Sequence, residues 1–423
     1  MGGPWWLCGN GDFGRLAGGA AGRGAGGTAA AAAAAVACGG AHTLLLGAGP
    51  QGGGHRVWAA GLGDEGQLGA PPPQGGGQGG GAAHAPAFVE VENLRSEGVV
   101  AVAAGHRHSA AVTEDGRLFT WGSNRSGQLG LGRAQAGACV GVPALVQALG
   151  GVKVAAVALG AEHTLALSEA GEVFAWGASG NGRLGHAAGG GAAPWEWRWW
   201  AQSEPLPRLV RALEGRRVAQ VAAGHHHSGC VCADTGDALL WGAGRFQQLG
   251  RGEEGTAALD SAEPVAVDLG GHSCAALALG GLHSAALTGS GRVFTWGTDE
   301  GGSLGHGRGV TSAAAPRAVE GLPGGASQVA CGWKHTAAAV AGRLFTWGWG
   351  GAVGEGGDGG PGEAGAGGLG GGQLGHPDPL SRAAPSEVRP PSGLLGGVGD
   401  GRPGPLAQVS CGFNHTGAVF AAP

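Results

Sequence analysis

Short runs of branched and small apolar residues, separated by polar turns, dominate the hydrophobic pattern of the chain. Residues 99–104 (VVAVAA) and 117–121 (RLFTW) are typical of strands, although their alternation of apolar and polar positions is imperfect. Just before the second run, residues 114–116 (EDG) predict a turn. Similar stretches recur along the chain, so its repetition is the first feature to define.

One half-motif has the form G-x-x-H-[ST], followed by small or branched apolar residues, and it occurs seven times. Its glycine suits a turn, because glycine adopts positive φ and allows close backbone approach. We expect the histidine, and the Ser or Thr beside it, to satisfy buried backbone groups. Seven equivalent histidines around a ring cannot converge on one metal ion, so we interpret them as structural. They are His42, His108, His163, His227, His283, His335 and His415.

A second half-motif consists of W-G, then a polar residue, usually Gln or Arg, and L-G. A degenerate copy starts at Trp58, and a seventh lies at the N-terminus, as residues 7–9 with 14–16. We expect each tryptophan to pack as a large apolar plate between neighbouring repeats. The tryptophans of the five clear copies are Trp121, Trp176, Trp241, Trp296 and Trp347.

The two ends of the chain each carry half of one repeat. The N-terminal copy has no histidine motif before it, and the motif at Gly412 has no W-G copy after it. A propeller is a ring of four-stranded sheets that closes without loose edges. We therefore predict an all-β fold: one seven-bladed β-propeller over residues 1–423, with 4–16 supplying the outer strands of the last blade. The predicted repeat units are about 36–69, 98–132, 153–186, 217–250, 274–305, 326–375, and 406–421 closed by 4–16.

Segments rich in Gly, Ala and Pro separate these units, and this composition is typical of flexible loops without a core. We interpret them as low-complexity inserts at about 17–37, 70–90, 133–145, 187–205, 351–371 and 377–404. One insert differs, because residues 194–200 read PWEWRWW. Trp and Arg are enriched at binding hot spots, so this segment is a candidate partner-binding loop. The alternative is that it packs on its own blade. Its candidate residues are Trp195, Trp197, Arg198, Trp199 and Trp200.

Composition narrows the functional classes. The chain has 98 glycines and no tyrosine, a bias typical of GC-rich coding, so we expect many glycines to carry no role. The net charge is −5, whereas a protein that holds nucleic acid through phosphate contacts is basic. The eight cysteines form no CxxC pair, which favours structural thiols in a reducing compartment. The longest apolar tract, 28–38, is shorter than the roughly 20 residues that span a bilayer. We expect a monomer in the cytoplasm, the nucleus or both, without a membrane partner.

Together the two half-motifs resemble the repeats of the regulator of chromosome condensation superfamily, over nearly the whole chain. Four stretches look like its plant and algal exchange-factor-like branch: residues 330–336 (ACGWKHT), 345–350 (FTWGWG), 372–376 (GQLGH) and 410–416 (SCGFNHT). The resemblance implies a propeller that binds other macromolecules. It leaves the activity open, because the superfamily hosts many functions on one ring.

The resemblance implies three functional hypotheses. The first is a protein-interaction module that acts as a guanine-nucleotide exchange factor or regulator for a small GTPase; none of that family's exchange residues matches a loop here. The second is a non-catalytic scaffold or a chromatin-associated adaptor; the charge does not support the chromatin partner. The third is ultraviolet-B reception, which in the superfamily uses tryptophans at the position after the motif glycine. Here only Trp333 occupies that position, whereas the other six copies carry Gly40, His106, Ala161, His225, Gly281 and Phe413.

We predict no covalent catalysis, no catalytic residue, no cofactor and no metal site. The clusters 106–108 (HRH) and 225–227 (HHH) invite a metal, but adjacent residues of a strand point to opposite faces. The glycine-rich segment 350–360 lacks the G-K-[ST] of a phosphate loop.

If the tryptophan-rich segment binds a partner, a Trp199→Ala/Trp200→Ala variant will lose partner capture while its melting temperature stays nearly unchanged. Thermal melts and affinity capture measure the two effects. A large loss of stability would show that these side chains belong to the core.

Overall fold

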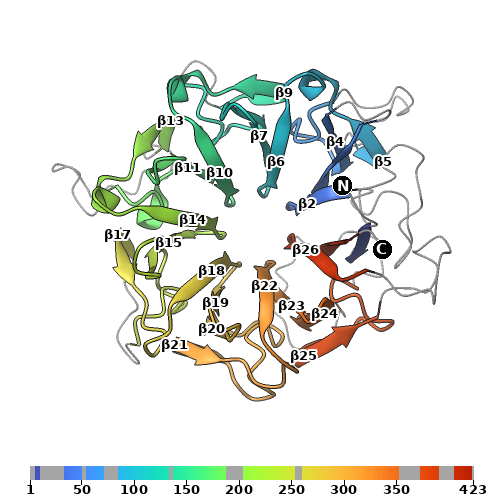
Figure 1. Ribbon diagram of the computed structural model, residues 1–423, viewed down its shortest axis with the longest axis vertical. Coiled ribbons are helices and arrows are strands. Elements are labelled where there is room, and N and C mark those ends of the chain that lie inside the picture. Colours follow the sequence, from blue (N-terminus) through green and yellow to red (C-terminus); the bar gives the residue numbers. More distant parts are fainter. Residues whose placement is uncertain are drawn as a thin grey trace.

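Seven antiparallel sheets stand around a central axis, as Figure 1 shows for the computed structural model of the chain. The predicted all-β, seven-bladed propeller is therefore confirmed. The structure describes residues 5–9, 33–49, 54–70, 84–132, 137–186, 203–252, 260–351, 372–389 and 404–421.

Six of the sheets have four strands, and in each sheet every strand pairs with the next along the chain. The first strand lies nearest the axis and the fourth lies outermost (Figure 1). The first three sheets are β2 (Ala33–Cys38), β3 (His42–Ala48), β4 (His55–Leu62) and β5 (His84–Glu90); β6 (Val99–Ala104), β7 (His108–Thr113), β8 (Leu118–Ser123) and β9 (Cys139–Leu145); and β10 (Val154–Leu159), β11 (His163–Ser168), β12 (Val173–Ala178) and β13 (Ser203–Leu209). The next three are β14 (Val218–Ala223), β15 (His227–Cys232), β16 (Ala238–Gly242) and β17 (Ser261–Ala266); β18 (Cys274–Leu279), β19 (His283–Thr288), β20 (Val293–Thr298) and β21 (Ser312–Ala318); and β22 (Ala326–Cys331), β23 (His335–Val340), β24 (Arg343–Gly348) and β25 (Arg382–Val388). Short 3-10 helices lie between strands: η3 (Glu92–Leu94), η5 (Gln147–Leu149), η6 (Gly180–Gly182) and η7 (Arg211–Leu213).

The seventh sheet joins the two ends of the chain. Its inner strands are β26 (Leu406–Cys411) and β27 (His415–Phe420), and the described part of the sheet is completed by β1 (Trp5–Gly9). β1 runs antiparallel to β27, with Trp5 opposite Val419 and Gly9 opposite His415. In Figure 1 the dark-blue β1 accordingly lies within the red last blade. The predicted closure by the two ends of the chain is confirmed.

The outer strands correct part of the sequence interpretation. β5, β9, β13 and β25 lie wholly or partly within ranges that we interpreted as inserts, namely 70–90, 133–145, 187–205 and 377–404, and β2 begins within 17–37. These outer strands do not show a clear hydrophobic pattern, because most of their residues are exposed or half-buried. In five outer strands a proline lies directly before the residue at which pairing resumes after the bulge, which removes an N–H from the edge and discourages pairing with other chains. The prolines are Pro143, Pro207, Pro264, Pro316 and Pro385.

The tryptophan of the W-G motif packs into the preceding blade. Trp121, for example, is fully buried against Leu44, Val57 and Leu68 of the first blade. Its indole Nε1–H donates to the carbonyl oxygen of Gln67 at 2.9 Å. Trp176, Trp241 and Trp296 donate in the same way to the residue before L-G in the blade before them. The glycine of that L-G pair also lies against the plate, since a β-carbon at Gly69 would collide with the Trp121 ring.

The seven motif histidines form a closed ring of hydrogen bonds between blades. His163 Nε2, for example, lies 2.9 Å from Ser228 Oγ of the next blade. That hydroxyl donates to the Arg183 carbonyl oxygen at 2.7 Å, the same oxygen that accepts from Trp241. The histidine partner is thus a hydroxyl and not the backbone group that we expected. The other links are His42–Ser109, His108–Thr164, His227–Ser284, His283–Thr336, His335–Thr416 and His415–Thr43.

The direction of these bonds fixes the proton on six of the histidines, whose hydroxyl partners each donate to a carbonyl oxygen. Because the Ser228 hydroxyl donates its only hydrogen to a carbonyl, His163 has to donate from Nε2. The motif histidines are at most 1% exposed, and burial lowers the pKa of His42 and His108 to about 3 and of His283 to about 4. These three histidines are therefore neutral at physiological pH.

Removing residues 1–16 will open the ring. The deletion takes away β1, whose Trp6, Leu7 and Cys8 are buried, and we expect a loss of about 3–6 kcal/mol in unfolding free energy. Thermal and urea unfolding measure the loss, and a deletion of residues 1–4 is the control because it leaves β1 intact. A 1–16 deletion that unfolds as cooperatively and at the same temperature as the full chain would contradict the closure.

The buried histidines will make the fold acid-sensitive. In the folded ring the pKa of His42, His108, His227 and His335 lies near 3, whereas an unfolded histidine binds its proton near pH 6.5. Below about pH 6.5 the unfolded chain therefore binds more protons, and stability falls as the pH drops toward 3, by about 1.4 kcal/mol per pH unit for each histidine. Urea unfolding between pH 7.5 and 4.5 at constant ionic strength measures the slope. A flat stability curve would contradict these protonation states.

Candidate partner-binding face

The turns of the G-x-x-H motif all lie on one face of the ring. Each connects the first strand of a blade to the second, such as the turn of residues 105–107 between β6 and β7. The second residue of each turn reaches the axis, where a cavity of about 100 Å³ opens. This axial pocket is lined by Gly40, His106, Ala161, His225, Gly281, Trp333 and Phe413, together with the motif glycines and Cys38, Cys331 and Cys411.

An aromatic column occupies one side of the axial pocket. Phe413 stacks on Trp333, with ring centroids 3.8 Å apart and planes inclined by 20°. His106 stacks on the Phe413 ring at 5.2 Å and 21°. His225 meets His106 edge to face at 5.8 Å. These rings come from four different blades, so only the closed propeller brings them together.

Glycine is required where the column rests on its neighbours. A β-carbon at Gly40 would collide with both the ring and the carbonyl of His106. A β-carbon at Gly281 would meet Trp333 in the same way. The turns are also joined by backbone bonds, since Gly40 N–H donates to Gly105 and Phe413 N–H to Gly39 at 3.0 and 3.1 Å. These glycines therefore have a structural role, unlike the many that we expected to carry none.

Lys334 borders the column on the same face. Its ammonium nitrogen lies 4.4 Å from the centroid of Trp333 and 5.6 Å from that of Trp349. It also forms an ion pair with Glu300 at 3.4 Å. The lysine side chain is only 17% exposed, so these contacts hold the cation in place against two apolar rings.

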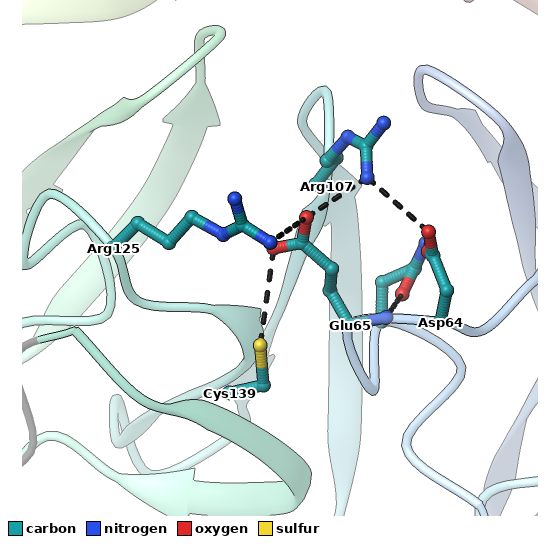
Figure 2. A network of polar contacts seen from close by, with 6 residues as sticks. Asp64, Glu65, Arg107, Arg125 and Cys139 are labelled. Atoms are coloured by element: carbon teal, nitrogen blue, oxygen red, sulfur yellow. Dashed lines mark hydrogen bonds and ion pairs between the residues drawn. The ribbon is translucent and has the colours of Figure 1, made fainter.

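A second charged group lies between the first and second blades (Figure 2). The carboxylate of Glu65, 5% exposed, is 2.8 Å from Arg107 and 3.2 Å from Arg125. Arg107 also reaches Asp64 at 3.3 Å, and the thiol of Cys139 points at Glu65 from 3.9 Å. Arg107 directly follows His106 of the column, so this group borders the axial pocket.

The centre of this face is neutral and its border is charged. Burial is the main cause that lowers the pKa of His106, and it lowers the pKa of His225 to about 3, so both rings are uncharged at neutral pH. Around them lie the ion pairs of Lys334, Arg107 and Arg125. An apolar centre within a polar rim is the usual composition of a protein–protein interface.

The chemical groups on this face can be described one by one. Within the described residues no three or more His, Cys, Asp or Glu side chains are placed to hold a metal ion. The thiols of Cys38, Cys331 and Cys411 have a pKa raised by burial, which makes them poor nucleophiles. No helix in the described part of the chain is long and apolar enough to cross a membrane.

The sequence-predicted residues divide into two groups. The candidate loop residues Trp195, Trp197, Arg198, Trp199 and Trp200 lie outside the described residues and stay a prediction. The motif histidines and tryptophans lie at the blade interfaces, as described above. The sequence did not identify the column of Trp333, Phe413 and His106 as a site. Their shared position after the motif glycine was the signal, and its meaning depends on which turns meet across the axis.

Comparisons with known proteins agree with this architecture. Residues 4–419 match the model of the RCC1-like domain family. The ultraviolet-B receptor UVR8 of Arabidopsis thaliana is 30% identical over 367 residues, which cover 86% of this chain and 70% of the receptor. The human E3 ubiquitin-protein ligase HERC2 is 35% identical over 254 residues, which cover 59% of this chain but 5% of the ligase.

Two solved structures share the fold over the whole chain. Prp20p of Saccharomyces cerevisiae superposes with a TM-score of 0.75 at 20% identity, covering 100% of this chain and 92% of Prp20p. Human WBSCR16 gives a TM-score of 0.74 at 22% identity, with 100% of both chains covered. The family match, the receptor and the seven-bladed ring together show that this chain belongs to the RCC1-like propeller family.

Proposed function

We propose that this propeller binds a small GTPase through the face that carries the axial pocket and accelerates release of the bound nucleotide. The proposed binding to a GTPase rests on one observation, the aromatic column of Trp333, Phe413 and His106 inside a rim of ion pairs. Aromatic and arginine side chains in this arrangement are the residues on which interface energy concentrates.

Fixed geometry favours this face over a loop-based surface. The column is stacked, Lys334 is held by two rings and a carboxylate, and the turns beneath are joined by backbone bonds. A partner therefore orders few side chains on binding, which lowers the entropic cost of association. Large side chains already in their bound positions are what a preformed docking face requires.

Exchange needs no covalent chemistry from the propeller. A protein that binds the nucleotide-free GTPase more tightly than the loaded form lowers nucleotide affinity by the same factor, because the two binding events are linked. A rigid face with no catalytic group is compatible with this mechanism. A structural neighbour adds support, because Prp20p of yeast binds Gsp1p and histones.

We do not propose ultraviolet-B reception, the activity of the plant receptor, for this chain. Trp333 is the single tryptophan among the seven axial positions, and Phe413 and the histidines occupy its neighbourhood. Absence of any ultraviolet-B-dependent change in oligomeric state is the expected result.

The proposal is tested by affinity capture from native cells, followed by nucleotide release from any recovered GTPase at micromolar propeller. We expect the wild type to accelerate release and a Phe413→Ala variant to bind about 10–100 times more weakly, as for a hot-spot residue.

The matched control is Arg117→Ala, because Arg117 follows the turn at the other end of β7 and so lies on the opposite face. This variant should keep wild-type capture and release. No acceleration by the wild type would remove exchange and leave a scaffold. Equal capture by the Phe413 variant would show that partners use a different surface.

A further inference from the structure

One blade carries a buried cation where its neighbours carry a neutral amide. The residue before L-G is glutamine in four described blades, Gln67, Gln128, Gln248 and Gln373, serine at position 303, and arginine at position 183. In three of the glutamines, Oε1 accepts the backbone N–H two residues earlier, as Gln128 does from Ser126 at 2.8 Å. The position therefore requires only an acceptor for this backbone N–H, and a charged side chain is not part of the repeat.

Arg183 is 6% exposed, and its hydrogen bonds are incomplete. Nε donates to the Gly180 carbonyl at 2.9 Å, and Nη2 donates to Asn181 Oδ1 at 3.3 Å. Nη1 is buried and has no hydrogen-bond partner among the described residues. Nor does any carboxylate of the described residues form an ion pair with this guanidinium, although every other buried charge discussed above has one.

His226 gives a second unpartnered group beside the arginine. Its Nδ1 is buried without a partner among the described residues, and its ring lies 4.4 Å from His225 of the axial pocket. Burial, followed by repulsion from Arg183 and Arg245, lowers the pKa of His226 to about 4. Burial also lowers the pKa of Arg183 itself. Asn181 and His226 are half-buried, so the pair lies next to solvent on the partner-binding face.

Two acidic groups lie near this pair, and both have hydrogen-bond partners elsewhere. Asp260 accepts from Asn181 at 2.6 Å and from the backbone of Gly244 at 3.0 Å. Glu162 accepts from Ser126 at 3.4 Å. Both carboxylates are exposed and are bonded elsewhere; they act to raise the pKa of Arg183, but less than burial lowers it, and neither forms an ion pair with the guanidinium. A buried charge of this kind is costly unless an opposite charge is supplied.

We propose that Arg183 and His226 form a binding site for an oxyanion, a carboxylate or a phosphate group, which completes the unused donor Nη1 of the guanidinium. Arginine suits this ligand because its planar donors match two oxygens of a carboxylate or phosphate. The site is independent of the proposed exchange activity, and it adjoins the axial pocket through His225. An oxyanion carried by a partner that docks on this face would occupy it.

The test measures binding of inorganic phosphate and of acetate to the full chain at pH 7, by calorimetry and thermal shift at constant ionic strength. We expect saturable binding of at least one anion, with a higher melting temperature at saturation. The anion that binds distinguishes a phosphate site from a carboxylate site.

Substitutions taken from the other blades provide the matched variants. Arg183→Gln copies Gln128, and His226→Leu copies Leu282, so each places a residue that another blade already accommodates. Arg183→Gln should lower affinity at least about tenfold, while its melting temperature without anion stays equal or rises. His226→Leu should weaken binding more modestly. Arg251→Gln removes an exposed arginine from the same face, outside the charged rim, and should leave the affinity within about twofold.

Three outcomes would overturn the proposal. The first is no saturable binding of either anion up to about 50 mM, far above the range of specific sites. The second is unchanged affinity in Arg183→Gln. The third is an equal loss in Arg251→Gln and Arg183→Gln, which would indicate general attraction to a charged face. Retained stability with lost affinity in the Arg183 variant alone supports the site.

Discussion

The structure depends on one carbonyl oxygen that recurs at six blade interfaces among the described residues. In the pair of blades three and four, the Arg183 carbonyl accepts from both Ser228 and Trp241, and the serine in turn accepts from His163. This arrangement couples the end of one W-G motif to the histidine motif of the next blade. Each interface is local, but the chain of histidine–hydroxyl bonds closes only when His415 reaches Thr43. Closure therefore makes the stability of each blade depend on the others.

The same constraint builds the candidate site. Because the histidines fix the first turn of every blade, the residue after each motif glycine is carried to the axis. Seven small residues there would leave an open channel. The actual set combines Trp333, Phe413 and His106 with Gly40 and Gly281, so large rings lie over glycines. The repeat supplies the position, and its departures from symmetry supply the chemistry.

The sequence predicts the features that repeat from blade to blade, and it does not predict the departures from that repeat. The blade number and the pairing of β1 with β27 were predictable because half-motifs with large, buried residues repeat along the chain. The outer strands were missed because they are exposed, short and interrupted by residues such as Pro207 and Pro385. The stack of Phe413 on Trp333 joins turns of neighbouring blades, and the incomplete bonding of Arg183 depends on distances that a single motif does not contain.

The most direct test of this account is hydrogen exchange, measured by mass spectrometry, on the propeller with and without its captured partner. The account predicts protection of the turns at residues 105–107, 225–226, 332–334 and 412–414, around the axial pocket. Protection confined to the opposite ends of the strands, at residues 114–117, 169–172 and 233–237, would contradict it.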